Sequence, residues 1–245
     1  ASHEDIKSFF AQHYAVNNLI LCVSGHIEFE KAVALTEKWF GDFAPANIPV
    51  RNLPQEPVQT EQRFMSVKRE VPQNVLTMMY HMCGRRDADY QVCDMLSDVL
   101  SNGMSSRFYR NVLVKSGLFT ELDASVSGTY DPGLFIVRAR LADGVSFDKA
   151  KDAIDAELAD FVRNGATAYE IEKCANKYES TRLFDMITYE KKGVKLCQYE
   201  LLGDAADINK EVGKYRCITQ DRLMNVAKNL LNPDNCSVLY YGPDA

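Results

Sequence analysis

The sequence predicts an α+β fold in which helices pack on one face of a mostly antiparallel sheet. Short apolar strands come in pairs separated by turns, and long amphipathic helices begin at capping residues. A helix–turn–strand pattern at the start of the chain also returns near its end. The first two observations predict one layer of helices and one sheet, and the third indicates a duplicated unit.

A helix followed by a strand is expected in residues 2–25. Ser2 can cap this helix, and the acidic residues in its first turn suit the positive end of the helix dipole. Helical periodicity resumes over 30–43. Residues 44–62 hold four prolines and little apolar periodicity, so they predict a linker.

The rest of the chain contains strands and helices with clear boundaries. Alternating apolar patterns predict strands at 63–69, 75–82, 119–127, 134–141 and 236–240. Apolar residues at helical spacing predict helices at 89–101, 105–115, 146–165 and 219–231. A capping box, Thr167-x-x-Glu170, opens a further helical region that continues towards Gly203.

Segment 2–25 aligns without a gap with segment 219–242, at a constant offset of 217 positions. Both copies have a capping residue, an amphipathic helix, a short turn with asparagine and a strand that ends at glycine. The matched pairs include Ser2 with Thr219, Ile6 with Leu223, Asn18 with Asn235, and Gly25 with Gly242. A true duplication predicts a repeat unit of this length, with about 190 further residues upstream.

Composition excludes two classes of function. The chain of 245 residues has a formal net charge of -6 without a long run of one sign, so no nucleic-acid partner is expected. No apolar stretch reaches the roughly 18 to 20 residues that span a bilayer, so no membrane partner is expected. The polar first residues do not resemble a signal peptide.

The seven cysteines are odd in number and widely spaced, without a CxxC motif. Several occupy apolar positions of periodic segments, as Cys22 does between Leu21 and Val23. This pattern favours buried, reduced thiols over disulfides or a metal site. We therefore expect a reducing compartment and a cytoplasmic location.

Tests for known catalytic and metal-binding motifs are negative. The four histidines, at positions 3, 13, 26 and 81, have no partner at the HExxH or HxxEH spacing, and Lys7 stands where a second histidine would follow His3. Ser146-x-x-Lys149 matches an SxxK motif, but helix capping explains it. The chain has no GxSxG, Walker A or GxGxxG motif. The sequence therefore predicts no catalytic residue and no metal ligand.

Four stretches resemble the M16 (pitrilysin-like) family of zinc peptidases. The first comprises segments 5–14, 18–25 and 34–43, and the others are LSDVLSNGMSSRFY at 96–109, TYDPGLF at 129–135, and 168–182. The second is similar to the family pattern LGGGMSSRLY. The resemblance implies a LuxS/MPP-like metallohydrolase fold, with two similar α+β domains that close on a peptide. It also implies that HxxEH and a distal glutamate bind zinc in the first domain, so this chain would be the second, non-catalytic half.

Many second domains of this family add an arginine and a tyrosine seven residues apart, which steady the substrate. Aligned on the segments 106–109 and 117–118, these positions fall on Leu113 and Thr120. Leucine cannot donate a hydrogen bond, and threonine can do so only over a short reach. Arg107 lies nearby but fits the helix pattern. The resemblance thus leaves Leu113 and Thr120 as candidates for a substrate-enclosing wall. Neither has the arginine or tyrosine side chain of the family pattern, so the pair is degenerate here.

The expected domains are a tail of the preceding repeat at 1–45, a Pro-rich linker at 46–62, and the second domain at 63–245. The expected partners are an upstream domain that carries zinc and a peptide substrate, which could add to strand 119–127. A homo- or heterodimer is a further expectation. The alternative is an inactive scaffold, or a partner subunit of an active HxxEH-bearing chain. In either case residues 1–45 lack their own sheet, so the isolated fragment should expose their apolar face, dimerise, or dock them irregularly.

Overall fold

The sheet is confirmed in a computed structural model that describes residues 1–50, 52–243 and 245. Five strands in the described part of the chain form one sheet in the order β1-β5-β2-β4-β3. Their bounds are Arg63–Lys68 (β1), Val75–Met82 (β2), Phe119–Val126 (β3), Gly133–Leu141 (β4) and Cys236–Gly242 (β5). Only β1 and β5 pair in parallel, and the other three pairings are antiparallel. The predicted mostly antiparallel sheet is therefore confirmed.

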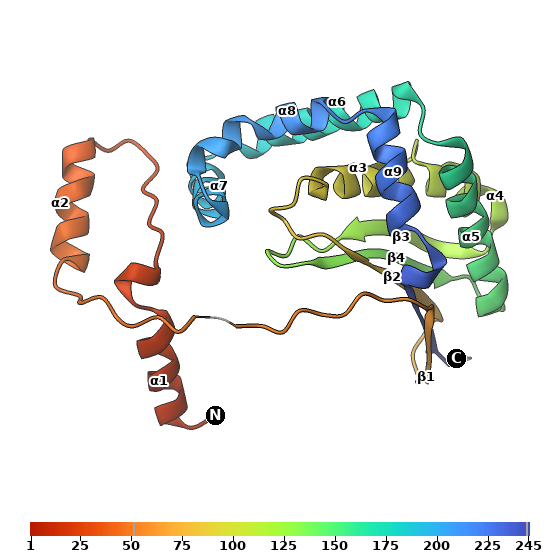
Figure 1. The fold of residues 1–245 in the computed structure, drawn as a ribbon, viewed down its shortest axis with the longest axis horizontal. Coiled ribbons are helices and arrows are strands. Elements are labelled where there is room, and N and C mark those ends of the chain that lie inside the picture. The colour runs from red at the N-terminus through yellow and green to blue at the C-terminus, as the bar shows by residue number, and fades with distance from the viewer. Residues whose placement is uncertain (51, 244) are drawn as a thin grey trace. The chain divides into compact units, whose positions relative to one another are not determined.

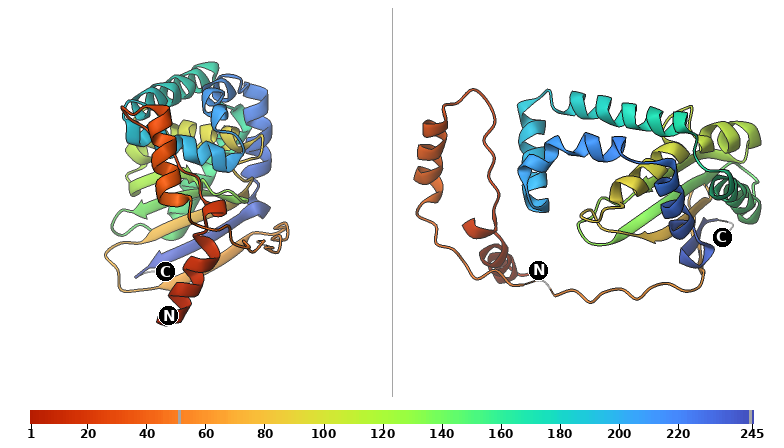
Figure 2. Two further views of the ribbon diagram at one scale, coloured as in Figure 1. Left: turned by 90° about the vertical axis from the view of Figure 1, so that its left-hand side faces the viewer. Right: turned by 45° about the horizontal axis from the view of Figure 1, so that its top comes forward.

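The α-helices of the described residues are α1 (His3–His13), α2 (Phe29–Phe40), α3 (Tyr90–Ser101), α4 (Val114–Ser116), α5 (Phe147–Asn164), α6 (Ala168–Asp185), α7 (Tyr189–Leu202), α8 (Glu211–Arg216) and α9 (Gln220–Leu230). Of these, α3, α5 and α9 lie on one side of the sheet (Figure 1). Figure 2 shows the same arrangement from two other directions. None of the described helices combines the length and the apolar character needed to cross a membrane.

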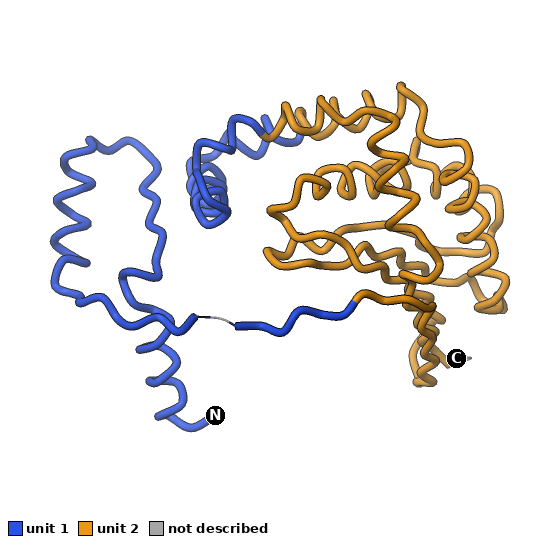
Figure 3. Tube along the Cα trace, viewed as in Figure 1, with its two compact units in different colours: residues 1–57, 181–210 blue, residues 58–180, 211–245 orange. Residues whose placement is uncertain are grey.

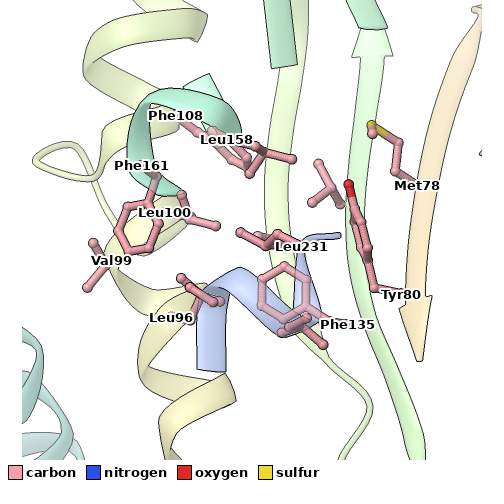
Figure 4. Packing of buried hydrophobic residues seen from close by; sticks show 14 of the residues in the cluster. Met78, Tyr80, Leu96, Val99, Leu100, Phe108, Phe135, Leu158, Phe161 and Leu231 are labelled. Carbon is pink, nitrogen blue, oxygen red and sulfur yellow. The ribbon is translucent and has the colours of Figure 1, made fainter. Parts of the chain in front are cut away.

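The core lies between these helices and the sheet. Alternate residues of β2 are buried, beginning at Leu76, because successive side chains of a strand point to opposite faces. From α3, Leu96 and Leu100 point into the same layer, next to Phe135 of β4 and Phe161 of α5 (Figure 4). All these side chains are less than 1% exposed, so this face of the sheet is fully covered.

The chain divides into two compact units (Figure 3). Unit 1 comprises residues 1–57 and 181–210, and unit 2 comprises 58–180 and 211–245. Unit 2 therefore contains the whole sheet. Unit 1 combines two segments that lie far apart in the sequence.

The two copies of the repeat have the same local structure. The Ser2 hydroxyl caps α1 and the Thr219 hydroxyl caps α9, each by accepting a hydrogen bond from a backbone N–H three residues further on. A 3-10 helix follows each one, at Val16–Asn18 and Pro233–Asn235. All four elements start and end at the same offset of 217 positions.

An asparagine holds the turn in each copy. The Asn18 side-chain amide donates a hydrogen bond to the carbonyl of His13, the last residue of α1, at 2.8 Å. The Asn235 amide donates to the carbonyl of Leu230, the last residue of α9, at 3.0 Å. The predicted duplication thus extends to individual hydrogen bonds.

Burial distinguishes the two copies. Helix α9 buries Leu223, Ala227 and Leu230, whereas α1 buries no residue. Ile6 and Phe10, the counterparts of Leu223 and Ala227, are 50% and 52% exposed. Residues 19–25 are extended but are not part of the sheet, whereas β5 lies between β1 and β2. Of the three outcomes expected for residues 1–45, this chain shows exposed apolar side chains.

The end of the linker is fixed to unit 2. Gln59 is 6% exposed, and its side-chain nitrogen donates to the carbonyl of Cys236 at 2.9 Å. Its side-chain oxygen accepts a hydrogen bond from the Ser237 hydroxyl at 3.1 Å. The described residues of 44–62 form neither helix nor strand, so Gln59 is the point at which this segment joins the sheet.

Two predicted helices differ from those in the structure. The segment expected as a helix at 105–115 is a π-helical turn at Phe108–Leu113 followed by α4. The helical region expected from Thr167 towards Gly203 is interrupted, because the Thr188 hydroxyl accepts a hydrogen bond from the Lys191 backbone N–H and starts α7. A 3-10 helix at Ala205–Asn209 and helix α8 were not predicted.

Candidate functional site

The face of the sheet opposite the helices is the first component of the candidate site. Its side chains alternate with the buried ones along each strand, and they are exposed or half-buried. The pairing register places Met79 between Ile136 and Ser237, and Thr77 between Arg138 and Leu239. We call this surface the open face, and its side chains include Val75, Thr77, Met79, Ile136, Arg138, Arg140, Leu239 and Tyr241. Its centre is largely apolar, and its charges lie towards β3.

Two pairs of opposite charge cross the β3–β4 boundary on the open face. Glu121 Oε2 lies 2.8 Å from Arg140 Nε. Asp123 is the register partner of Arg138. Burial raises the pKa of Asp123, Glu121 raises it further, and Arg138 opposes both effects. The part of the open face near β3 therefore carries both positive and negative side chains, in positions set by the register of the strands.

Strand β3 is an edge strand of the sheet. The Ser127 backbone N–H donates to the carbonyl of Leu134 at 2.8 Å, which identifies these residues as a hydrogen-bonded pair. Because such pairs alternate in antiparallel ladders, Leu122, Ala124 and Val126 direct their backbone groups away from β4. The Ser101 hydroxyl donates to the outward carbonyl of Ala124 at 2.8 Å. The outer edge of β3 thus presents backbone groups, and the end of α3 contacts it at Ala124.

The structure places Leu113 and Thr120 at the two ends of one turn. Leu113 ends the π-helical turn and packs, half-buried, against the core. Gly117 follows with φ +66°, a left-handed conformation that favours glycine, and reverses the chain into β3. Thr120 is exposed and sits at a β-bulge between Phe119 and Glu121.

These two side chains differ in what they can contribute. A β-bulge re-aims a side chain, and bulges and π-helical turns are both frequent near functional sites. The Thr120 hydroxyl donates to the carbonyl of Arg140 at 3.4 Å. Leu113 offers no polar atom beyond its backbone. The role of both residues as part of a substrate wall stays a prediction.

Arg107 has a structural role, as the helix pattern predicted. Its Nε lies 2.8 Å from Glu170 Oε1, and its Nη2 donates to the carbonyl of Gly165 at 2.6 Å. The guanidinium also stacks over Phe161. Burial by itself raises the pKa of Glu170, but hydrogen bonds from Arg107 and Thr167 together outweigh it and lower this pKa to about 2. Arg107 therefore joins the π-helical turn to the start of α6.

No three or more histidine, cysteine, aspartate or glutamate side chains in the described residues are grouped so that they could hold a metal ion. His3 and His13 lie on exposed α1, and His81 lies half-buried on β2. All seven cysteines are free. The residues that the structure describes therefore do not fit a zinc site. The expected cytoplasmic location stays a prediction.

A buried polar network joins α3 to α8, and sequence reasoning did not find it. Glu211 is 1% exposed, and one of its carboxylate oxygens lies 3.2 Å from both Arg85 and Gln91. The Tyr215 hydroxyl donates to Asp94, and burial raises the pKa of both groups. The partners lie more than 100 positions apart, so no local sequence signal could reveal them. The network holds α8 against the core and provides no reactive group at the surface.

Comparisons with known proteins agree with this geometry. A family model described as the peptidase M16 inactive domain matches residues 1–178. The chain is similar to the uncharacterized zinc protease YmxG of Bacillus subtilis (strain 168), with 21% identity over 234 residues. This match covers 94% of the chain and 56% of YmxG.

Solved structures show the same relationship. A protease from Helicobacter pylori matches with a TM-score of 0.90 and 19% identity, over 98% of this chain and 59% of that chain. The peptidase M16 inactive domain from Pseudomonas fluorescens matches with a TM-score of 0.83 and 17% identity, over 100% of this chain and 58% of that chain. At these identities the structural likeness establishes the fold alone. The chain spans somewhat more than half the length of each of these relatives.

Proposed function

The chain belongs to the peptidase M16 family, as an inactive domain of its zinc proteases, and from this premise we propose that its open face and edge strand β3 form a wall that encloses a peptide substrate. The position of β3 at the edge of the sheet carries this proposal. An extended peptide can add to such an edge through main-chain hydrogen bonds. The charge pairs next to the edge would then favour some side chains of the peptide over others.

The proposal assigns no step of hydrolysis to this chain. The relative YmxG is named a zinc protease, whereas the described residues here include no group that could hold a metal ion. We infer that zinc, which would activate water and polarise the scissile carbonyl, is bound by an upstream half. The role left to this chain is to bind and orient the peptide.

We propose the domain boundaries that the repeat predicts. Residues 1–45 are the end of a preceding repeat, 46–62 are a linker and 63–245 are the second domain. The matching hydrogen bonds of Asn18 and Asn235 support this division, because they show the same turn in both copies. The length of the relatives supports it as well, since each has room for a further domain.

A proline substitution on β3 tests peptide binding. Val126→Pro removes a backbone N–H that points away from β4, so the ladder to β4 keeps its hydrogen bonds. We expect the full-length protein to lose peptide affinity by about tenfold, the effect of one or two main-chain hydrogen bonds. Val126→Ile keeps the N–H and is the matched control. Fluorescence anisotropy with a labelled extended peptide measures both affinities.

Two readouts interpret the result. Circular dichroism and thermal unfolding must show that both variants keep the sheet. Equal peptide affinity in a folded Val126→Pro variant would contradict binding at this edge, and it would leave the open face as the only remaining part of the wall.

One observation favours a second function, that of a catalytically inactive scaffold or partner subunit. The positions where many family members have an arginine and a tyrosine carry Leu113 and Thr120, and Leu113 is half-buried against the core. Co-purification of the full-length protein with a chain that contains HxxEH would support this function. Peptide hydrolysis by the full-length protein as a monomer would exclude it.

A further inference from the structure

Helix α7 packs against the extended segment of the first copy within unit 1. The Cys197 thiol lies 3.9 Å from the carbonyl oxygen of Ile20. A methyl group at Gly193 would lie 3.7 Å from Cys22 Sγ and 3.7 Å from Ser24 Cβ. Gly193 and Cys197 are four residues apart, so they share one face of the helix. This face contacts the side of the segment that carries Cys22 and Ser24.

The repeat shows which side of the segment this is. Cys22 and Ser24 correspond, at the offset of 217, to Leu239 and Tyr241 of β5. Both of those side chains belong to the open face of the unit 2 sheet. Helix α9, the counterpart of α1, packs on the opposite face. Helix α7 therefore lies on the side of the segment that corresponds to an open face.

A groove of about 670 Å³ lies next to this contact and is not filled by the described residues. Its walls are mainly apolar and include Ile20, Leu21, Tyr189, Val194 and Leu201. The counterpart of the segment, β5, has a strand on each side. The segment should therefore have two neighbouring strands as well, and these would bring apolar side chains to the groove.

We propose that α7 docks across the domain boundary onto the open face of the sheet in the preceding repeat, with Gly193 at the point of closest approach. The occupant of the groove is that upstream sheet, and residues 19–25 are one of its central strands. The proposal rests on the assignment of residues 1–45 to the preceding repeat. A helix of the second half then covers part of the first half and limits how far the two can separate.

The cysteine pair at the contact provides the test. Cys22 and Cys197 are neighbours and both are half-buried. Burial raises the pKa of the Cys197 thiol, and the nearby Cys22 raises it further. Oxidised glutathione would convert the two thiols into one disulfide, releasing two molecules of reduced glutathione. We expect non-reducing mass spectrometry of the full-length protein to show a Cys22–Cys197 cross-link. Exposed Cys217 should carry glutathione instead.

A pair of glycine variants shows whether close approach matters. Gly193→Leu places a large side chain in the contact and should lower the yield of the cross-link by about tenfold. Gly213→Leu is the matched control, because a Cβ at Gly213 meets nothing within 4 Å and the yield should stay unchanged.

Separate glutathione adducts on Cys22 and Cys197, without a cross-link, would overturn the docking of α7. An unchanged yield in Gly193→Leu would overturn the close approach. The cross-link does not depend on peptide binding by β3, so this result and the result of Val126→Pro can fail independently.

Discussion

The two copies of the helix–turn–strand unit have the same backbone structure but different surroundings. In both, a hydroxyl caps the helix and an asparagine amide bonds to the helix end. The second copy packs under a sheet, whereas the first has its apolar side chains about half exposed. The two copies thus share their local hydrogen bonds, and burial against a sheet distinguishes them. A comparison of matched variants in the two copies therefore measures how much packing against the sheet adds to the free energy of unfolding.

The largest expected difference between the copies is in the core. Leu223→Ala removes a side chain that is fully buried and should lower the free energy of unfolding by about 2–5 kcal/mol. Its counterpart Ile6→Ala should change it by less than about 0.5 kcal/mol in this chain, because Ile6 is half exposed. Urea denaturation measures both.

The full-length protein turns this pair into a test of the domain boundary. If residues 1–45 complete an upstream core, Ile6→Ala should become about as destabilising there as Leu223→Ala is here. If Ile6→Ala still changes the free energy of unfolding only slightly in the full-length protein, the assignment of residues 1–45 to an upstream repeat is contradicted.

A half-buried carboxyl group sharpens the comparison between the two units. Burial raises the pKa of Asp98 in unit 2 to about 6 from 3.8, whereas Lys191 lowers the pKa of exposed Asp185 in unit 1. The folded pKa of Asp98 exceeds its unfolded value, so the ionised carboxylate costs stability above pH 6. This cost falls as the pH drops through 6 and is absent below about 4.

Asp98→Asn should therefore raise the free energy of unfolding at pH 7.5 by about 1–3 kcal/mol, while keeping an acceptor for the Asn102 amide. The gain should disappear near pH 4. Thermal unfolding across this range measures it, and Asp185→Asn should give no such gain. A benefit of Asp98→Asn that did not change with pH would contradict the assigned titration.

The smallest of the three differences concerns the turn. Asn235→Ala removes hydrogen bonds to the carbonyls of Leu230 and His81, both at 3.0 Å, and should cost about 1–2 kcal/mol. Asn18→Ala removes one exposed hydrogen bond, so its effect on unfolding should be about 0.5 kcal/mol or less. Equal effects of the two variants would show that the sheet adds nothing at this position.

The sequence predicted most elements of unit 2 because their signals are local. The alternation of β2, the apolar spacing of α3 and the caps of α5 and α9 each mark an element within its own residues. The π-helical turn at Phe108–Leu113 was missed, because its wider spacing gives no recognisable period over six residues. The start of α7 at Thr188 was missed although a threonine cap was present in the sequence.

The candidate site was harder to predict than the fold, because it depends on which strands are neighbours. Nothing in residues 119–127 indicates that β3 lies at the sheet edge, since that position follows from the pairing of β4 with β2 and of β2 with β5. The parallel pairing of β1 with β5 joins the two ends of unit 2 and has no local signal either. The family resemblance pointed to Leu113 and Thr120, and the structure adds that the turn between them ends in a bulge.

The anchoring of Gln59 to β5 makes the linker a tether of defined length. On the proposed division, the preceding repeat ends near residue 45 and the tether is fixed at Gln59, so few residues separate the two halves. A short tether keeps each half at an effective concentration on the order of millimolar near the other. Contacts too weak to hold two separate proteins together would then suffice to close the halves. On the proposed function, the two halves would open for a peptide and close again without dissociating, at a rate that does not depend on protein concentration.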